Sequence, residues 1–109
     1  MPHPPSDVQG QKVRPQVEKL RADLDASLVR ELAREHEHLS WAHFRRQLRP
    51  VSFRLSDSRL LGRWVIAERT IEMSRALCIE EPWGAVLEVL KHEMAHQFVS
   101  EVLGVHDET

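Results

Sequence analysis

The chain of 109 residues lacks a second cysteine and has no long apolar segment. Because Cys78 is alone, an internal disulfide is excluded, and this usage fits a reducing compartment, so we expect a cytoplasmic protein. A lone cysteine is more often a small buried hydrophobic residue than a nucleophile, and we assign Cys78 no chemistry. No stretch approaches the ~18 consecutive apolar residues of a membrane span, and the N-terminal segment lacks the apolar core of a secretory signal. We therefore expect no membrane partner.

Length and composition bound the number of domains. The chain is 41% hydrophobic and 29% charged, which suits one hydrophobic core and not two. Residues 1–15 are polar, contain several prolines and glutamines and show no apolar periodicity, so we expect a disordered leader there. The remainder, residues 16–109, is predicted to form a single domain.

The net charge of −2 conceals an uneven distribution of charged side chains. Residues 1–43 have six basic and seven acidic side chains, residues 44–75 have eight and three, and residues 76–109 have one and seven. The basic segment 44–75 either contacts nucleic acid or an acidic partner, or consists of solvated strand-edge arginines that pair with the acidic third of the chain, residues 76–109. We favour the second interpretation. The arginines concerned are Arg45, Arg46, Arg49, Arg54, Arg59, Arg63, Arg69 and Arg75.

Hydrophobic periodicity predicts helix first and strands afterwards. Apolar residues recur at helical spacing over residues 15–37, which indicates an amphipathic helix. The period then changes to two over residues 51–56, and further strand candidates follow at 61–67 and 70–75. Because the connections between these runs are short, an antiparallel meander is the economical arrangement.

The most informative motif is the run His92-Glu93-Met94-Ala95-His96. Residues i and i+4 project from one face of a helix, so His92 and His96 can bring two imidazole nitrogens to one zinc ion. Glu93 lies about 100° further round the helix. That position keeps its carboxylate off the metal but near a water on the metal, where it can act as general base.

The surroundings of this motif favour a helix over residues 80–103. Acidic residues and Pro82 suit its start, Gly104 suits its end, and the apolar density is typical of a buried helix. The competing interpretations are a chance pattern among seven histidines, or two ordinary histidines satisfied by hydrogen bonds. A metal is the more economical partner for two imidazoles on an apolar helix, so we favour zinc.

An N-terminal helix, a meander and a helix carrying these residues resemble the SprT-like, or Spartan-like, family of zinc metallopeptidases. The resemblance covers residues 20–103 and is most specific at residues 92–97. The runs Leu61-Gly62-Arg63-Trp64 and Thr70-Ile71-Glu72-Met73-Ser74 support it. It implies an α+β zincin fold that binds zinc through His92 and His96, uses Glu93 as base and cleaves a protein or peptide substrate.

The resemblance also implies a third metal ligand beyond the helix, a histidine followed by glycine. His106 is the only later histidine and is followed by Asp107, so the family pattern is not matched there. We keep His106 as the candidate for the third ligand, with Asp107 and Glu108 in reserve. Asp107 is included because Gly104 to Asp107 has the Gly-x-x-Asp spacing of aspartate-ligand zincins. The glycine and the histidine that follow the second histidine in the metzincin pattern are absent from this chain. We expect a domain that is incomplete at its C-terminus.

Two functions of different classes follow from the sequence. The first is a metallopeptidase that hydrolyses peptide bonds with zinc-activated water. The second is a non-catalytic scaffold in which the metal motif is vestigial and the basic segment 44–75 binds protein or nucleic acid.

Overall fold

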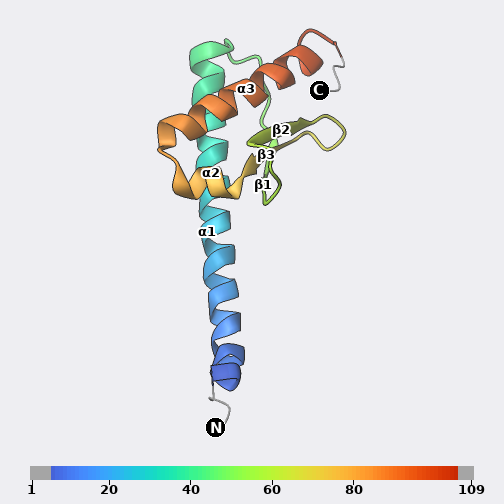
Figure 1. The fold of residues 1–109 in the computed structure, drawn as a ribbon. Helices are drawn as coiled ribbons and strands as arrows, with labels where there is room; N and C mark the ends of the chain where they lie inside the picture. Colours follow the sequence, from blue (N-terminus) through green and yellow to red (C-terminus); the bar gives the residue numbers. More distant parts are fainter. Residues whose placement is uncertain (1–5, 106–109) are drawn as a thin grey trace.

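The structure is a computed structural model that describes residues 6–105. The elements, in chain order, are α1 (Ser6–His43), β1 (Ser52–Ser56), β2 (Gly62–Val65), β3 (Thr70–Ser74), α2 (Arg75–Glu80) and α3 (Trp83–Glu101) (Figure 1). The expected α+β class, with an N-terminal helix, three strands and a final helix with the His-Glu-His motif, is confirmed. None of the described helices is both long and apolar enough to span a membrane.

The sheet is mixed, and the prediction of an antiparallel meander is wrong. The strand order is β1-β3-β2, with β1 parallel and β2 antiparallel to β3. The last strand takes the centre because it is the most buried of the three: Ile71 and Met73 are fully buried, whereas β1 and β2 are more exposed. A central strand pairs with a neighbour at each edge, so its residues are the most shielded from solvent, and the most apolar strand is favoured there.

One face of the sheet packs against helices and the other carries charges. Phe53 and Trp64 both pair in register with Ile71, and this apolar face joins a core with residues of α1 and α3. On the opposite face Arg54 Nε donates to Glu72 at 2.8 Å. The core therefore lies between the sheet and the two long helices, and α3 packs on it.

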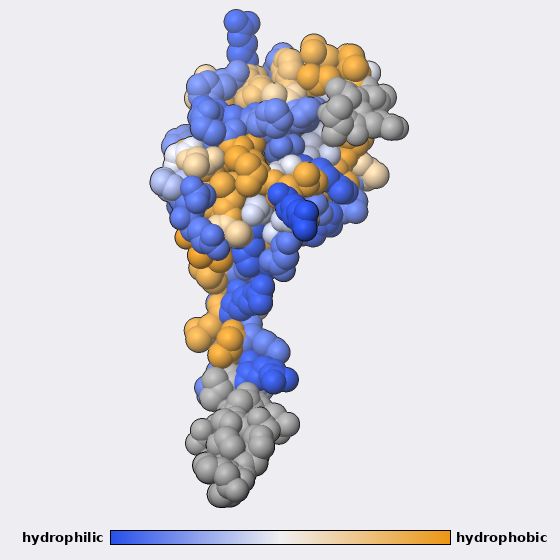
Figure 2. Space-filling view, viewed as in Figure 1, coloured by the Kyte–Doolittle hydropathy of each residue, from blue (hydrophilic) through white to orange (hydrophobic). Residues whose placement is uncertain are grey.

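Helix α1 is longer than predicted at both ends, since it begins at Ser6 and ends at His43. Its first turns occupy part of the segment 1–15 for which we expected a disordered leader. Only the later part of α1 packs on the core, where Leu32 is fully buried. The earlier part projects from the molecule, and Figure 2 shows apolar side chains on this narrow stem (Figures 1 and 2). The exposed apolar residues there are Val17, Leu20 and Leu24.

A short helix that the sequence analysis did not predict connects the sheet to α3. Helix α2 begins at Arg75, which we had placed in the third strand. The side chain of Ser74 accepts a hydrogen bond from the backbone N–H of Leu77 at 3.0 Å and so caps the helix. Cys78 of α2 is buried, as expected for a small hydrophobic residue.

Candidate metal and catalytic site

Helix α3 places His92 and His96 on one face, as their spacing predicts. The helix begins after Pro82 and ends before Gly104, whose φ of +73° is a conformation that glycine adopts without strain. The two imidazole rings lie 4.9 Å apart between centroids, with their Nε2 atoms 3.3 Å apart. His92 is exposed and His96 half-buried, so the histidines face the surface and not the apolar interior that we expected.

The separation of the two nitrogens can be compared with that required by zinc. Zinc binds histidine nitrogen at about 2.0–2.1 Å in tetrahedral geometry, which places two nitrogen ligands roughly 3.3–3.4 Å apart. The Nε2 atoms of His92 and His96 lie at 3.3 Å. The separation of the two nitrogens is therefore compatible with one zinc ion held between them.

The side chain of Glu93 lies in the contact between α3 and β2, next to Gly62. Glu93 is only 6% exposed, and burial raises the pKa of its carboxyl. The charges of His92 and His96 and a backbone hydrogen bond from Trp64 act in the opposite direction. The carboxylate thus lies in a sheltered position beside the face that carries the two histidines.

Gly62 makes room for this carboxylate. A Cβ atom at position 62 would lie 2.9 Å from Val89 Cγ1, 3.0 Å from Glu93 Cγ and 3.2 Å from Glu93 Oε2, so a side chain there requires its neighbours to move. In the sequence, Gly62 was noted only as part of the four-residue run that supports the family resemblance. The role of Gly62 depends on the close approach of β2 to α3, which the sequence does not reveal.

A cleft of about 450 Å³ opens beside these residues, between the outer edge of β2 and α3. Leu61 accepts a hydrogen bond from the N–H of Ser74, so it faces β3. In an antiparallel ladder alternate residues face the partner strand, so the backbone of Gly62 faces the open edge. The residues that line the cleft are Leu61, Gly62, Glu88, Val89, His92 and Glu93.

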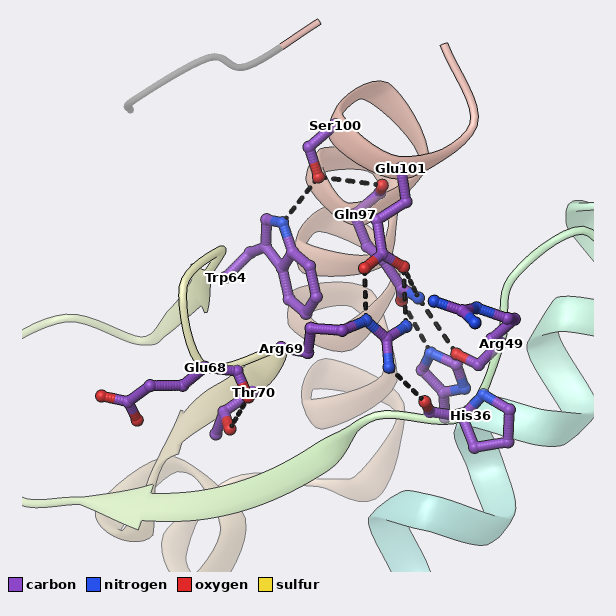
Figure 3. Close-up of polar contacts among 10 residues, drawn as sticks. His36, Arg49, Trp64, Glu68, Arg69, Thr70, Gln97, Ser100 and Glu101 are labelled. Atoms are coloured by element: carbon purple, nitrogen blue, oxygen red, sulfur yellow. Dashed lines mark hydrogen bonds and ion pairs between the residues drawn. The ribbon is translucent and has the colours of Figure 1, made fainter. Parts of the chain in front are cut away.

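At Gln97, the residue after His96, a partly buried polar network joins α3 to the rest of the molecule (Figure 3). The amide nitrogen of Gln97 donates to the carbonyl of Arg49 and to Glu101 Oε1, both at 3.1 Å. The amide oxygen of Gln97 must then accept, so His36 donates to it through Nε2 at 2.8 Å. Burial lowers the pKa of His36.

The same network reaches the turn between β2 and β3. Arg69 donates to Glu101 Oε1 at 2.8 Å and to the carbonyl of Pro50 at 3.1 Å, and Trp64 Nε1 donates to Ser100 Oγ at 2.8 Å (Figure 3). These bonds join α3 to α1, to the sheet and to the segment at Arg49 and Pro50. They fix the part of α3 that directly follows His96, and their partners could not be inferred from the sequence.

The third metal ligand is not found in the described part of the chain. Among residues 6–105 no group of three or more His, Cys, Asp or Glu side chains is arranged to hold a metal. The candidates His106, Asp107 and Glu108 lie outside the described residues. The described site thus comprises two candidate ligands, His92 and His96, and the neighbouring carboxylate of Glu93.

The arginines of segment 44–75 divide into two groups. Arg54, Arg63, Arg69 and Arg75 form ion pairs with acidic side chains. Among the side chains that the structure describes, those of residues 14–105, Arg69 is the one of these four that pairs with the acidic C-terminal third, through Glu101, whereas Arg75 binds Asp25 of α1. Within the same residues, no ion pair is formed by Arg45, Arg46, Arg49 and Arg59.

Comparison with known protein families identifies the family of this chain. The sequence model of the SprT-like family matches residues 29–109, which is most of the chain. The protein therefore belongs to the SprT-like family. Searches of curated proteins and of solved structures give no match.

Proposed function

We propose that this protein is a zinc-dependent peptidase that hydrolyses peptide bonds of a protein or peptide substrate. The observation that carries the proposal is the 3.3 Å separation of the Nε2 atoms of His92 and His96, with Glu93 on the same helix. Membership of the SprT-like family supports it. The nearby cleft offers an open strand edge, along which an extended peptide can lie.

Each residue has a defined role in this proposal. His92 and His96 hold the zinc ion, which when bound supplies Lewis acidity toward water and a substrate carbonyl. Glu93 takes a proton from the attacking water at its carboxylate and returns it to the leaving amine. Gly62 leaves space for that carboxylate, and its backbone faces the cleft where the scissile segment would lie.

The substitution Glu93→Gln tests this proposal. It preserves shape but removes the base, so turnover of a fluorogenic casein substrate should fall by ~10²–10⁴-fold. Zinc content, measured by elemental analysis, should stay equal to that of the unmodified chain. Glu80→Gln is the matched control, since Glu80 is exposed on α2 and should leave both readouts unchanged.

A scaffold without catalysis is the second candidate, because the described residues supply only two metal ligands. Under this alternative the unmodified chain and Glu93→Gln show the same absence of turnover, and a partner binds both equally. Contact of segment 44–75 with nucleic acid is a further proposal. It would depend on the four arginines that form no described ion pair.

A further inference from the structure

Strand β1 forms the edge of the sheet opposite the catalytic cleft, and its outer backbone groups are open. The N–H of Ser52 donates to the carbonyl of Arg69 at 3.1 Å, so Ser52 faces β3. Because facing alternates along a strand, the backbone groups of Phe53 and Leu55 face away from the sheet. Among the described residues, none accepts a hydrogen bond from either of these two N–H groups.

A groove of about 610 Å³ lies beside the start of this strand, with α1 as its other wall. The ring of Phe53 meets the ring of His36 edge-on, with centroids 5.8 Å apart. A strand edge beside a helix is the arrangement by which several domains add an extended peptide to their sheet. Six of the eleven residues that line the groove are apolar, namely Ala33, Trp41, Leu48, Pro50, Val51 and Phe53, and the charged side chains of Arg34, Glu37 and Arg46 line it as well.

A cationic side chain stands at the rim of this groove. Arg46 lines it and forms no ion pair with any described residue. Its guanidinium lies 3.8 Å from the ring centroid of Trp41, a side chain that is 57% exposed. Arg45 and Arg46 both have positive φ, of 52° and 62°, which non-glycine residues rarely adopt in succession. The turn and the contact with Trp41 thus bring Arg46 to the groove.

We propose that this groove binds an extended peptide segment of a protein partner that carries apolar residues flanked by an acidic residue. The partner backbone pairs with the outer groups of Phe53 and Leu55, its apolar side chains fill the groove, and its carboxylate binds Arg46. Neither His92 nor His96 lines the groove. The interaction is therefore separate from the proposed catalysis and does not depend on it.

The probe is a fluorescein-labelled, end-capped peptide, Glu-Val-Thr-Val-Thr-Val-Glu, which presents an acid at either end of an extended segment. We expect saturable binding by fluorescence polarisation, weakened by about tenfold or more in Arg46→Glu. Arg45→Glu is the matched control because Arg45 has the same conformation but does not line the groove. The Arg45→Glu variant should change the affinity for the peptide less than twofold. A peptide with lysine in place of glutamate at both ends should bind the unmodified chain poorly.

Backbone pairing is tested without altering the protein. The same peptide N-methylated at alternate residues should lose binding, and amide hydrogen exchange at Phe53 and Leu55 should slow when the unmodified peptide is present. The proposal is overturned if no binding occurs at millimolar peptide, if Arg45→Glu and Arg46→Glu act alike, or if exchange at these two amides is unchanged. Protection that rises with protein concentration without peptide would instead identify a second copy of the chain as the occupant.

Discussion

Glycine 62 is the residue whose substitution best reports on the packing of Glu93. In Gly62→Ala the new methyl group meets Val89 and Glu93 at 3.2 Å or less, so we expect a loss of about 1–3 kcal/mol in the free energy of unfolding. Gly84→Ala is the matched control, because no atom lies within 4 Å of a Cβ there and alanine favours helix by about 1 kcal/mol. Urea unfolding of both variants decides the matter. Equal effects would show that β2 and α3 do not approach closely at Gly62.

The protonation of His36 should make stability depend on pH. Burial lowers its pKa in the folded protein, so the unfolded chain binds the proton more readily. Stability is then highest above the unfolded pKa of about 6.5 and is lost as the pH falls through that value. Urea midpoints measured with a chelator present should fall from pH 7 to pH 5.

The variant His36→Gln should show a shallower fall over the same interval, whatever its stability at pH 7. His43→Gln is the control, since His43 is exposed at the end of α1, and it should keep the slope of the unmodified chain. An unchanged slope in His36→Gln would mean that other groups account for the acid sensitivity.

At the scale of single residues, the sequence predicted the His-Glu-His motif but not the side chains that hold its helix in place. His92 and His96 come together because helical spacing alone determines which residues share a face. His36 and Gln97 are 61 positions apart, and their bond exists only once α1 and α3 pack together. The exposure of the histidine pair was also mispredicted, because apolar density along a helix does not tell which face the neighbouring elements cover.

Helix α1 combines a packed part and a projecting part, and substitutions should affect the two differently. Leu32 is fully buried, so Leu32→Ala should reduce the free energy of unfolding by about 2–5 kcal/mol. Val17, Leu20 and Leu24 are 53%, 68% and 46% exposed. Replacing all three by glutamine should change stability by less than about 1 kcal/mol, since little burial is lost. A large loss in the triple variant, measured by urea unfolding, would show that a second surface covers this stem in solution.

For the sheet, periodicity identified the strands but not their neighbours. Alternation of apolar and polar residues is a local property, and it marked all three segments within a few residues of their observed bounds. Strand order depends on which segment gains most from pairing at both edges, and that preference is a property of the assembled core. The parallel pairing of β1 and β3 therefore became visible only in the structure.

The whole molecule is elongated, with principal extents of 66 × 25 × 20 Å, because the stem of α1 projects beyond the body. Its core is apolar and is assembled by α1, the sheet, α2 and α3 together. Neither His92 nor His96 belongs to that core, and both reach the surface of α3. Folding of this chain is thus expected not to require the metal, in contrast to small domains whose core is organised around zinc.

Zinc should nevertheless stabilise the folded chain through mass action. A ligand that binds only the folded state at 100 times its dissociation constant adds about 2.7 kcal/mol, so the melting temperature should rise with zinc concentration. Treatment with a chelator should leave the protein folded, as judged by circular dichroism, and should remove the zinc-dependent shift. His92→Ala and His96→Ala should each abolish that shift, because either variant leaves the described site with a single ligand. Unfolding on chelation would show that the metal organises the core, whereas a shift that survives both variants would place the zinc elsewhere on the molecule.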